Sequence, residues 1–404
     1  MKIGLIKENK NPYDKRVPFD PSQLATIVRN AEGYFDFIIE PSAHRCFADS
    51  EYIDEGLTVS AEVEDCDILM GIKEVPIASI IPNKTYIFFS HTTKKQEANR
   101  RMLQHILENH VTLIDYEGIK DKNGNRLVAF GKWAGIVGAY NGLWTYGKKT
   151  GLFDLKRAID CYDIQELKQE LKKISLPPIK MVITGTGKVG GGVQEILKLV
   201  KVKEVSPADL ISKYYEVPVY AVLSSEDYNR RKADGVYNRE EFHSHPELYE
   251  SDFLKYTEAC DILFAAAYWH PRAPRLFAPK DLLADDFNIS VIADISCDID
   301  GSIPTTLRSS SVADPVYDVD RKTMREIPAF GSQHSISVMA IDNLPCELPR
   351  DASRDFGNQL MQYLIPELML ESSDLLEKAT IAKNGKLMPA YTYLEGYVNP
   401  ITTN

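Results

Sequence analysis

The sequence predicts an α/β fold made of two doubly wound domains with a cleft between them. Strand-like and helix-like segments alternate along the chain, which is typical of doubly wound sheets. The chain has 404 residues, whereas single hydrophobic cores rarely grow beyond about 300 residues. A glycine-rich turn restarts the alternation after two prolines at 177 and 178. We therefore expect one domain at 1–130 plus 352–404 and a second at 131–351.

The first domain begins with short strand and helix signals. Ile3–Ile6 and Phe35–Ile39 are apolar runs of strand length, and Asp20 followed by Pro21 predicts a helix start between them. Lys94–Asn109 carries apolar residues at helical spacing. The region after residue 351 also has a helical apolar pattern, and we expect its helices to pack back onto this domain.

Three apolar runs of the first domain end on ionisable residues. They are Ile68–Ile72 before Lys73 and Glu74, Tyr86–Ser90 before His91, and Val111–Ile114 before Asp115 and Glu117. If the runs are neighbouring parallel strands, their carboxyl ends share the edge where α/β proteins bind ligands. Proton transfer needs such side chains within reach of a substrate. The alternative is structural: His91 caps a strand, and Lys73 and Glu74 are solvated in a loop.

Composition and charge narrow the function classes. Apolar residues make up 44% and charged residues 26% of the chain, as in ordered globular proteins. The formal net charge of −11 argues against nucleic-acid binding, which needs a basic surface. No run approaches the roughly 20 apolar residues of a membrane helix, and the first ten residues do not resemble a signal peptide. A cytoplasmic protein without membrane contact is expected.

The six cysteines lie far apart, without a CxxC pair or a zinc-type cluster. Reduced structural thiols are therefore expected, and no metal site is predicted. The sequence leaves the oligomeric state open.

The second domain contains the clearest motif of the chain. A glycine- and aromatic-rich segment at 131–150 is expected to be a closely packed helix, and segment 155–174 is also helical in character. Ile179–Thr184 then has the pattern of a strand and precedes a helix. The turn between them consists of Gly185, Thr186, Gly187, Lys188, Val189 and Gly190. This order predicts a Rossmann-type dinucleotide site, with the pyrophosphate at the helix start; the alternative is a glycine run that merely tightens the turn.

The residue that would contact the adenosine ribose is less evident. If 202–205 is the second strand, Ser206 stands where NAD-binding proteins often carry an acidic residue. Cations at Lys203, Arg230 and Arg231 could instead meet the 2′-phosphate of NADP, although each also fits a solvated surface. NAD and NADP both remain open.

Two further strand ends are expected beside the nicotinamide. Segment 261–267 leads to Tyr268 and Trp269, and segment 290–295 leads to Ser296. These three residues are candidate cofactor neighbours. For Tyr268 and Trp269 the alternative is core packing with a polar group at one end.

Several strings resemble the lysine-forming saccharopine dehydrogenases. They are GIKEVP at 71–76, TYIFFSHTTKKQEAN at 85–99, LIDYE at 113–117, RLVAFGKWAG at 126–135, TGTGKVGGG at 184–192 and IDNLP at 341–345. The chain is more similar still to the lysine-ketoglutarate reductase half of the aminoadipic semialdehyde synthases, which YWHPRAPRLF at 268–277 and ADISCDIDGSI at 293–303 also resemble. Alanine dehydrogenase and the transhydrogenase nucleotide-binding subunit share the layout but not these strings. The saccharopine-oxidising half has no counterpart in this sequence.

The resemblance implies an oxidoreductase of lysine metabolism, with lysine, 2-oxoglutarate and saccharopine as its small-molecule substrates. The reaction would be the reversible, NAD(P)H-dependent condensation of L-lysine with 2-oxoglutarate to saccharopine. By similarity, Lys73 and His91 are the acid/base pair, and Glu74 and Glu117 tune them. Two alternatives stay open: an alanine dehydrogenase-like or other amine and 2-oxo acid dehydrogenase, and a nucleotide-binding module without turnover.

The resemblance also assigns binding residues. Arg16 and Arg126 match positions that the family uses for substrate carboxylates, and Asp342 matches a residue near the nicotinamide. Their structural alternatives are ion-pair partners for the arginines and a helix N-cap for Asp342. The fungal pattern has a lysine five residues before the arginine matched by Arg16, where this chain has Asn11 with Lys10 beside it. Lys10 is therefore the candidate substrate cation there. Val189 replaces a cysteine of fungal relatives, so no redox role is expected.

Overall fold

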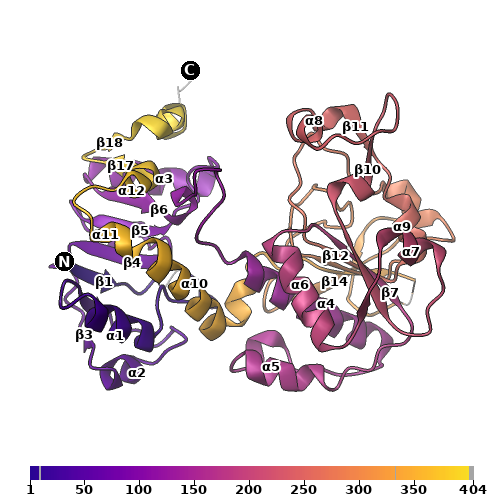
Figure 1. The fold of residues 1–404 in the computed structure, drawn as a ribbon, viewed down its shortest axis with the longest axis horizontal. Helices are drawn as coiled ribbons and strands as arrows, with labels where there is room; N and C mark the ends of the chain where they lie inside the picture. The colour runs from indigo at the N-terminus through magenta and orange to yellow at the C-terminus, as the bar shows by residue number, and fades with distance from the viewer. Residues whose placement is uncertain (9–10, 333, 400–404) are drawn as a thin grey trace. The chain divides into compact units, whose positions relative to one another are not determined.

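The computed structural model describes residues 1–8, 11–332 and 334–399. The chain forms two compact units, one of Met1–Phe130 with the chain from Pro349 onward and one of Gly131–Leu348 (Figure 1). Each unit has an eight-stranded sheet dominated by parallel pairs and packed with helices. The fold is therefore α/β with two Rossmann-like sheets. The return to the first unit comes at Pro349 because a long helix begins there, three residues before the expected position 352.

The sheet of the first unit has the strand order β18-β17-β6-β5-β4-β1-β2-β3. Its strands are β1 (Lys2–Leu5), β2 (Asp36–Ile39), β3 (Thr58–Val59), β4 (Ile68–Lys73), β5 (Thr85–Phe89), β6 (Thr112–Asp115), β17 (Thr380–Lys383) and β18 (Lys386–Leu387). Its helices are α1 (Pro21–Asn30), α2 (Asp49–Asp54), α3 (Glu97–Glu108), α10 (Pro349–Tyr363), α11 (Ile365–Leu368), α12 (Asp374–Ala379) and α13 (Glu395–Val398). Strands β1 to β6 pair in parallel, whereas β17 runs antiparallel to β6.

Local sequence explains the elements of this unit. The Asp20 carboxylate accepts the Gln23 N–H and the Gln23 side chain caps Asp20 in return, while Pro21 occupies the first turn, so α1 begins where expected. The purely helical pattern expected after residue 351 is wrong at Thr380–Lys383. That segment is strand β17, whose buried Ile381 packs in the core on one face of the sheet.

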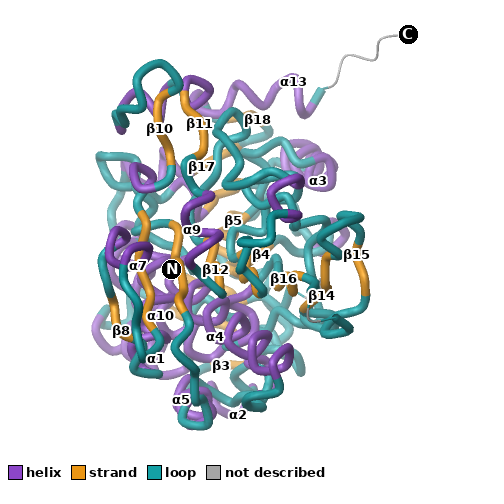
Figure 2. The backbone as a smooth tube through the Cα atoms, turned by 90° about the vertical axis from the view of Figure 1, so that its right-hand side faces the viewer, coloured by secondary structure: helices purple, strands orange, loops and turns teal. Residues whose placement is uncertain are grey.

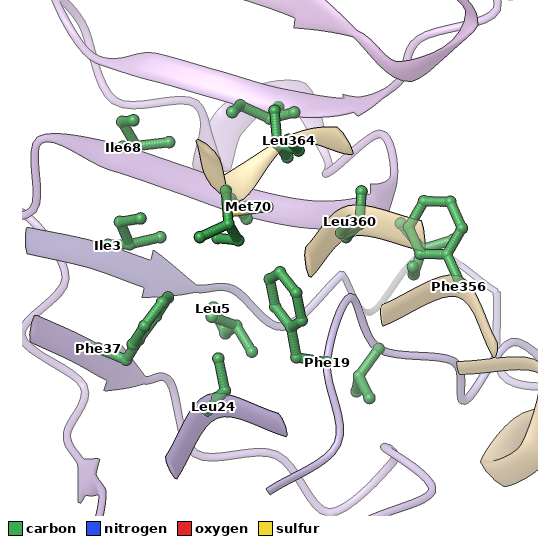
Figure 3. Close-up of a cluster of buried hydrophobic side chains, with 14 of the residues drawn as sticks. Ile3, Leu5, Phe19, Leu24, Phe37, Ile68, Met70, Phe356, Leu360 and Leu364 are labelled. Atoms are coloured by element: carbon green, nitrogen blue, oxygen red, sulfur yellow. The ribbon is translucent and has the colours of Figure 1, made fainter. Parts of the chain in front are cut away.

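Helix α10 contributes to the core of the first unit. Phe356 and Leu360 of this helix, and Leu364 directly after it, belong to one buried cluster with Leu5 of β1 and Met70 of β4 (Figure 3). A second cluster on the sheet includes residues of α3 and the C-terminal helices. Because both faces are covered by apolar side chains, the polar ends of the strands are left to the edge of the sheet.

The sheet of the second unit has the order β15-β14-β16-β13-β12-β7-β9-β8. Its strands are β7 (Lys180–Thr184), β8 (Lys203–Glu204), β9 (Val219–Leu223), β12 (Ile262–Ala265), β13 (Val291–Asp294), β14 (Val316–Val319), β15 (Glu326–Ile327) and β16 (Ile336–Met339). A separate antiparallel pair consists of β10 (Asn229–Arg231) and β11 (Tyr249–Ser251), which lie side by side in Figure 2. The helices are α4 (Gly131–Thr150), α5 (Ile164–Leu171), α6 (Lys188–Leu199), α7 (Pro207–Ser212), α8 (Arg239–Ser244) and α9 (Leu254–Ala259).

Glycines let α4 and α6 pack in close contact, as the small residues of α4 predict. A Cβ on Gly135 would lie 1.9 Å from the Val189 carbonyl oxygen, and a Cβ on Gly192 would lie 2.2 Å from the Lys132 carbonyl oxygen. Backbone therefore meets backbone at this crossing. The helix expected at 155–174 is shorter than expected, because α5 starts at Ile164, capped by Asp163, after an irregular segment with one 3₁₀ turn.

No helix among the described residues combines the length and the hydropathy needed to cross a membrane.

Candidate active site

Strands β4, β5 and β6 are parallel neighbours in the sheet of the first unit, so the strand ends identified in the sequence share an edge. His91 Nδ1 lies 3.6 Å from Glu74 Oε2, and both residues are largely shielded from solvent. Lys73 is the last residue of β4 and is partly buried. Among the residues that the structure describes, its ammonium group makes no hydrogen bond or ion pair, unlike the neighbouring carboxylates.

Buried Asp115 connects the ends of β5 and β6. One carboxylate oxygen accepts the Ser90 N–H at 3.0 Å and the Ser90 hydroxyl, and the other accepts the Glu117 N–H at 2.7 Å. Ser90 also bonds the Thr92 hydroxyl at 2.8 Å. Burial raises the pKa of Asp115. His91, between these anchored residues, has φ of +54°, a conformation that non-glycine residues adopt where surrounding contacts hold them.

Glu117 carries the second ion pair of this edge. Its Oε1 lies 2.9 Å from a terminal nitrogen of Arg126, and its Oε2 accepts the Thr93 hydroxyl at 3.3 Å. The Glu117 side chain is buried whereas that of Arg126 is 43% exposed. Arg126 therefore combines a fixed inner contact with a guanidinium group that reaches solvent.

Arg16 is held by a carboxylate of its own segment. Its Nε donates to Asp14 Oδ1 at 2.8 Å and a terminal nitrogen donates to Asp14 Oδ2 at 2.6 Å. The guanidinium lies 4.2 Å from the centre of the Phe130 ring. Arg16, Asp14, Glu8 and Asn11 line a cavity of about 340 Å³. Lys10 lies outside the described residues.

The glycine turn of the second unit has the geometry of a phosphate-binding loop. Gly185 has φ of +99°, and its backbone approaches Ala266 and Ala267 so closely that a Cβ would lie 3.0 Å from them. A Cβ on Gly190 would lie 2.0 Å from the Gly185 carbonyl oxygen. At Gly187, the N-cap of α6, a Cβ would meet nothing within 4 Å. The turn is thus tight at its first and third glycines and open at the second, where a ligand's phosphates would approach.

A cavity of about 920 Å³ extends from this turn. Its walls include residues 185–189, the residues that follow β9 and β12, and residues of the segment that contains β10 and α8. This volume lies in the range of small-molecule and cofactor sites. The open face at Gly187, the helix start and the cavity together fit a bound dinucleotide.

Comparisons with known proteins match this layout. Residues 4–137 match the family model "Alanine dehydrogenase/PNT, N-terminal domain". Alpha-aminoadipic semialdehyde synthase of Mus musculus is 31% identical over 97% of this chain and 47% of its own length. Saccharopine dehydrogenase [NAD(+), L-lysine-forming] of Yarrowia lipolytica is 27% identical over 90% of this chain and 92% of its own length. The chain is thus similar to these enzymes over nearly its whole length.

The chain spans about half the length of the semialdehyde synthases that it matches. Among solved structures, L-alanine dehydrogenase superposes with a TM-score of 0.67 at 19% identity, covering 98% of this chain and all of that one. The similarity to alanine dehydrogenase establishes a shared fold.

The prediction for Ser206 is wrong in its structural premise. Segment 202–205 contributes only the edge strand β8, and β9 is the strand that pairs with β7. The segment between α6 and β9 holds β8 and α7, so the second strand lies later than the glycine spacing indicates. Ser206 caps α7 through the Asp209 N–H, away from the cavity lining.

The other predicted cofactor neighbours separate into two groups. Tyr268, 85% exposed, and Trp269, whose indole N–H donates to the Pro274 carbonyl at 3.2 Å, both line the cavity. Ser296 and Asp342 do not line it: the Ser296 hydroxyl donates to Asp294 at 2.6 Å, and Asp342 is exposed in the turn after β16. Their contacts with a nicotinamide stay predictions.

Two charged residues of the cavity wall are missed by sequence reasoning. Glu226 follows the end of β9, and Arg239 begins α8, where it makes no ion pair with the described residues. In contrast, Arg230 pairs with Glu250 and Arg231 with Asp234, so the two arginines proposed for a 2′-phosphate are occupied elsewhere. A correct assignment of β9 from its VYAVL pattern would have directed attention to Glu226.

Proposed function

We propose that this chain catalyses the reversible NAD(P)H-dependent condensation of L-lysine with 2-oxoglutarate to give saccharopine. The observation that carries the proposal is the edge of β4 to β6, where Lys73, the Glu74–His91 pair and the Glu117–Arg126 pair lie on adjacent strand ends. Relatives named for lysine-forming saccharopine dehydrogenation support the choice of substrates.

The chemistry needs both an acid and a base. The side-chain amine of lysine has a pKa near about 10.4, so a base must remove a proton before the amine attacks the ketone of 2-oxoglutarate. A proton must then reach the former carbonyl oxygen so that it can leave as water. We assign these transfers to Lys73 and His91. Glu74 holds the His91 ring through the contact at 3.6 Å, and Glu117 fixes Arg126 at the same edge.

Cations are needed for the substrate carboxylates. Arg126 offers an exposed guanidinium beside the acid/base groups, and a planar fork of donors suits a carboxylate. Arg16 lines a neighbouring cavity and is assigned to the second substrate, with Lys10 as a further candidate cation. When the substrate binds, Arg16 would exchange its hydrogen bonds to Asp14 for hydrogen bonds to the substrate carboxylate.

The second unit is assigned to the dinucleotide. The turn from Gly185 to Gly190 would hold the pyrophosphate, and Tyr268 and Trp269 would border the bound molecule. When bound, the reduced nicotinamide supplies the hydride that reduces the carbon–nitrogen double bond. The cofactor is NAD or NADP.

The alanine dehydrogenase fold favours one rival, an amino-acid dehydrogenase that combines a 2-oxo acid with ammonia. The two reactions are distinguished by the loss of NADH or NADPH absorbance with 2-oxoglutarate, measured once with L-lysine and once with ammonia. The proposal expects dinucleotide oxidation that requires lysine. Turnover with ammonia instead would replace it by the rival, and no turnover with any amine would favour a binding module.

A further inference from the structure

Glu8 lies beside the end of β4, beyond the point where main-chain hydrogen bonds join the described residues of the first segment to that strand. Strand β1 ends at Leu5, and among the described residues the last main-chain hydrogen bond between the two segments runs from the Ile6 N–H to the Met70 carbonyl at 3.0 Å. Beyond it, the Glu8 carboxylate accepts the backbone N–H groups of Ile72 and Lys73. A side chain thus continues the ladder where the neighbouring strand has stopped.

This contact falls on an irregularity of β4. Against β5, Met70 pairs with Ile87 and Lys73 with Phe89, so three steps along β4 match two along β5. Such a bulge redirects the side chains that follow it. Gly71 lies inside the irregular stretch, where a Cβ would be 3.1 Å from Glu8 Oε1. The missing side chain of Gly71 therefore gives the Glu8 carboxylate room to reach the strand.

The surroundings of Glu8 affect the protonation of its carboxyl group. Glu8 is partly buried and lines the same cavity as Asp14 and Arg16. Lost hydration and the nearby Asp14 raise its pKa to about 8, against the backbone hydrogen bonds and Arg16, which lower it. A protonated carboxyl group still accepts hydrogen bonds through its carbonyl oxygen. Glu8 can therefore hold the strand in either protonation state.

We propose that Glu8 is a positioning residue for Lys73: its carboxyl group fixes the bulge of β4 and thereby the place where Lys73 presents its ammonium group. The inference rests on the proposed function for the role of Lys73, but not for the backbone contact. Glu8 acts on the reaction through the strand and needs no contact with substrate.

The kinetic test compares Glu8→Leu, which loses the acceptor at similar volume, with Glu8→Gln, which keeps an acceptor oxygen. We expect Glu8→Leu to lower kcat at least tenfold with the dinucleotide Kd unchanged, and Glu8→Gln to recover kcat to within about threefold of wild type. In a Lys73→Met background, Glu8→Leu should add little. A Glu8→Leu kcat within twofold of wild type, or equal losses in the Leu and Gln variants, would overturn the proposal.

Glu40 provides a matched control. Glu40 follows β2, and its carboxylate accepts the N–H of Lys7, the residue before Glu8, at 2.9 Å. The contact thus holds the same segment as Glu8, but to β2 rather than to β4. Glu40→Leu should leave kcat within twofold of wild type, and a loss as large as that of Glu8→Leu would mean general disruption of the segment.

Hydrogen exchange at the Ile72 and Lys73 amides gives a readout that needs no activity. We expect faster exchange at these amides in Glu8→Leu than in wild type and Glu8→Gln; unchanged exchange would overturn the contact itself. If wild type has no lysine-dependent turnover, the proposed function fails while this measurement still tests Glu8.

Discussion

Replacing Gly187 with valine is expected to abolish most dinucleotide binding while the second unit stays folded. Gly187 has φ of −84°, which any residue adopts, and a Cβ there meets nothing within 4 Å. The valine methyl groups would enter the space next to the start of α6. Phosphates that normally approach the backbone at this point would be displaced.

The size of the effect follows from the bonds lost. Losing one hydrogen bond between backbone and a charged phosphate costs about 1.5 to 3 kcal/mol, which corresponds to roughly a 10- to 150-fold rise in Kd. The fold should lose little, because exchanging glycine for a β-branched residue at an N-cap costs on the order of 1 kcal/mol. Binding and stability therefore respond to different degrees.

Fluorescence titration with NADH and NADPH, together with urea unfolding, measures both quantities. Gly191→Ala is the matched control, since its Cβ also meets nothing within 4 Å but the residue lies one turn further along α6. The control should bind normally and gain up to about 1 kcal/mol in helix stability. Undiminished binding by folded Gly187→Val would refute the placement of the phosphate loop.

Four further outcomes are expected. Lys73→Met should lower kcat by about 10²- to 10⁴-fold with dinucleotide Kd unchanged; a normal kcat removes Lys73 from the mechanism. Gly192→Ala should cost about 2 to 3 kcal/mol in urea unfolding, because its Cβ would meet the Lys132 carbonyl oxygen at 2.2 Å; a neutral effect contradicts the α4–α6 contact. Arg239→Ala should raise the Kd of NADPH more than that of NADH, since Arg239 is a cation of the cavity wall; equal changes exclude this role. Burial raises the pKa of Glu347 from its ordinary value of 4.5 to about 7. The protonated carboxyl group therefore stabilises the fold at low pH, and this contribution, up to about 3 kcal/mol, is lost as the pH rises through the folded-state pKa. Urea unfolding at pH 5 and pH 8 should show less of this loss in Glu347→Gln, and identical profiles would contradict it.

The strand ends of the first unit were predictable because each apolar run stops at an ionisable residue. Lys73, His91 and Glu117 lie at or just beyond the ends of adjacent strands, since neighbouring parallel strands place their carboxyl ends together. An ion pair was one alternative for Arg16, but the sequence could not identify Asp14 as its partner, because Asp14 is one of several nearby charged residues. The same holds for Glu8, whose contact depends on where β1 stops.

In the second unit the glycine motif predicted the turn but not the next strand. The motif constrains backbone over six residues, and those constraints are visible in the sequence as missing side chains. The path after α6 depends instead on the length of an insertion, which placed β9 beyond the expected spacing and left Ser206 outside the cavity lining. The glycine turn could therefore be predicted from the sequence, whereas the strand that follows the inserted segment could not.

The most direct test of the proposed reaction follows the side-chain nitrogen of lysine. Enzyme, NADPH or NADH, 2-oxoglutarate and L-lysine labelled with ¹⁵N at the side-chain amine are incubated, and the products are analysed by mass spectrometry. The proposed condensation predicts saccharopine that retains the label, formed in equal amount to the dinucleotide oxidised. Dinucleotide oxidation without labelled saccharopine would contradict it. So would the formation of glutamate in a parallel incubation in which ammonia replaces lysine.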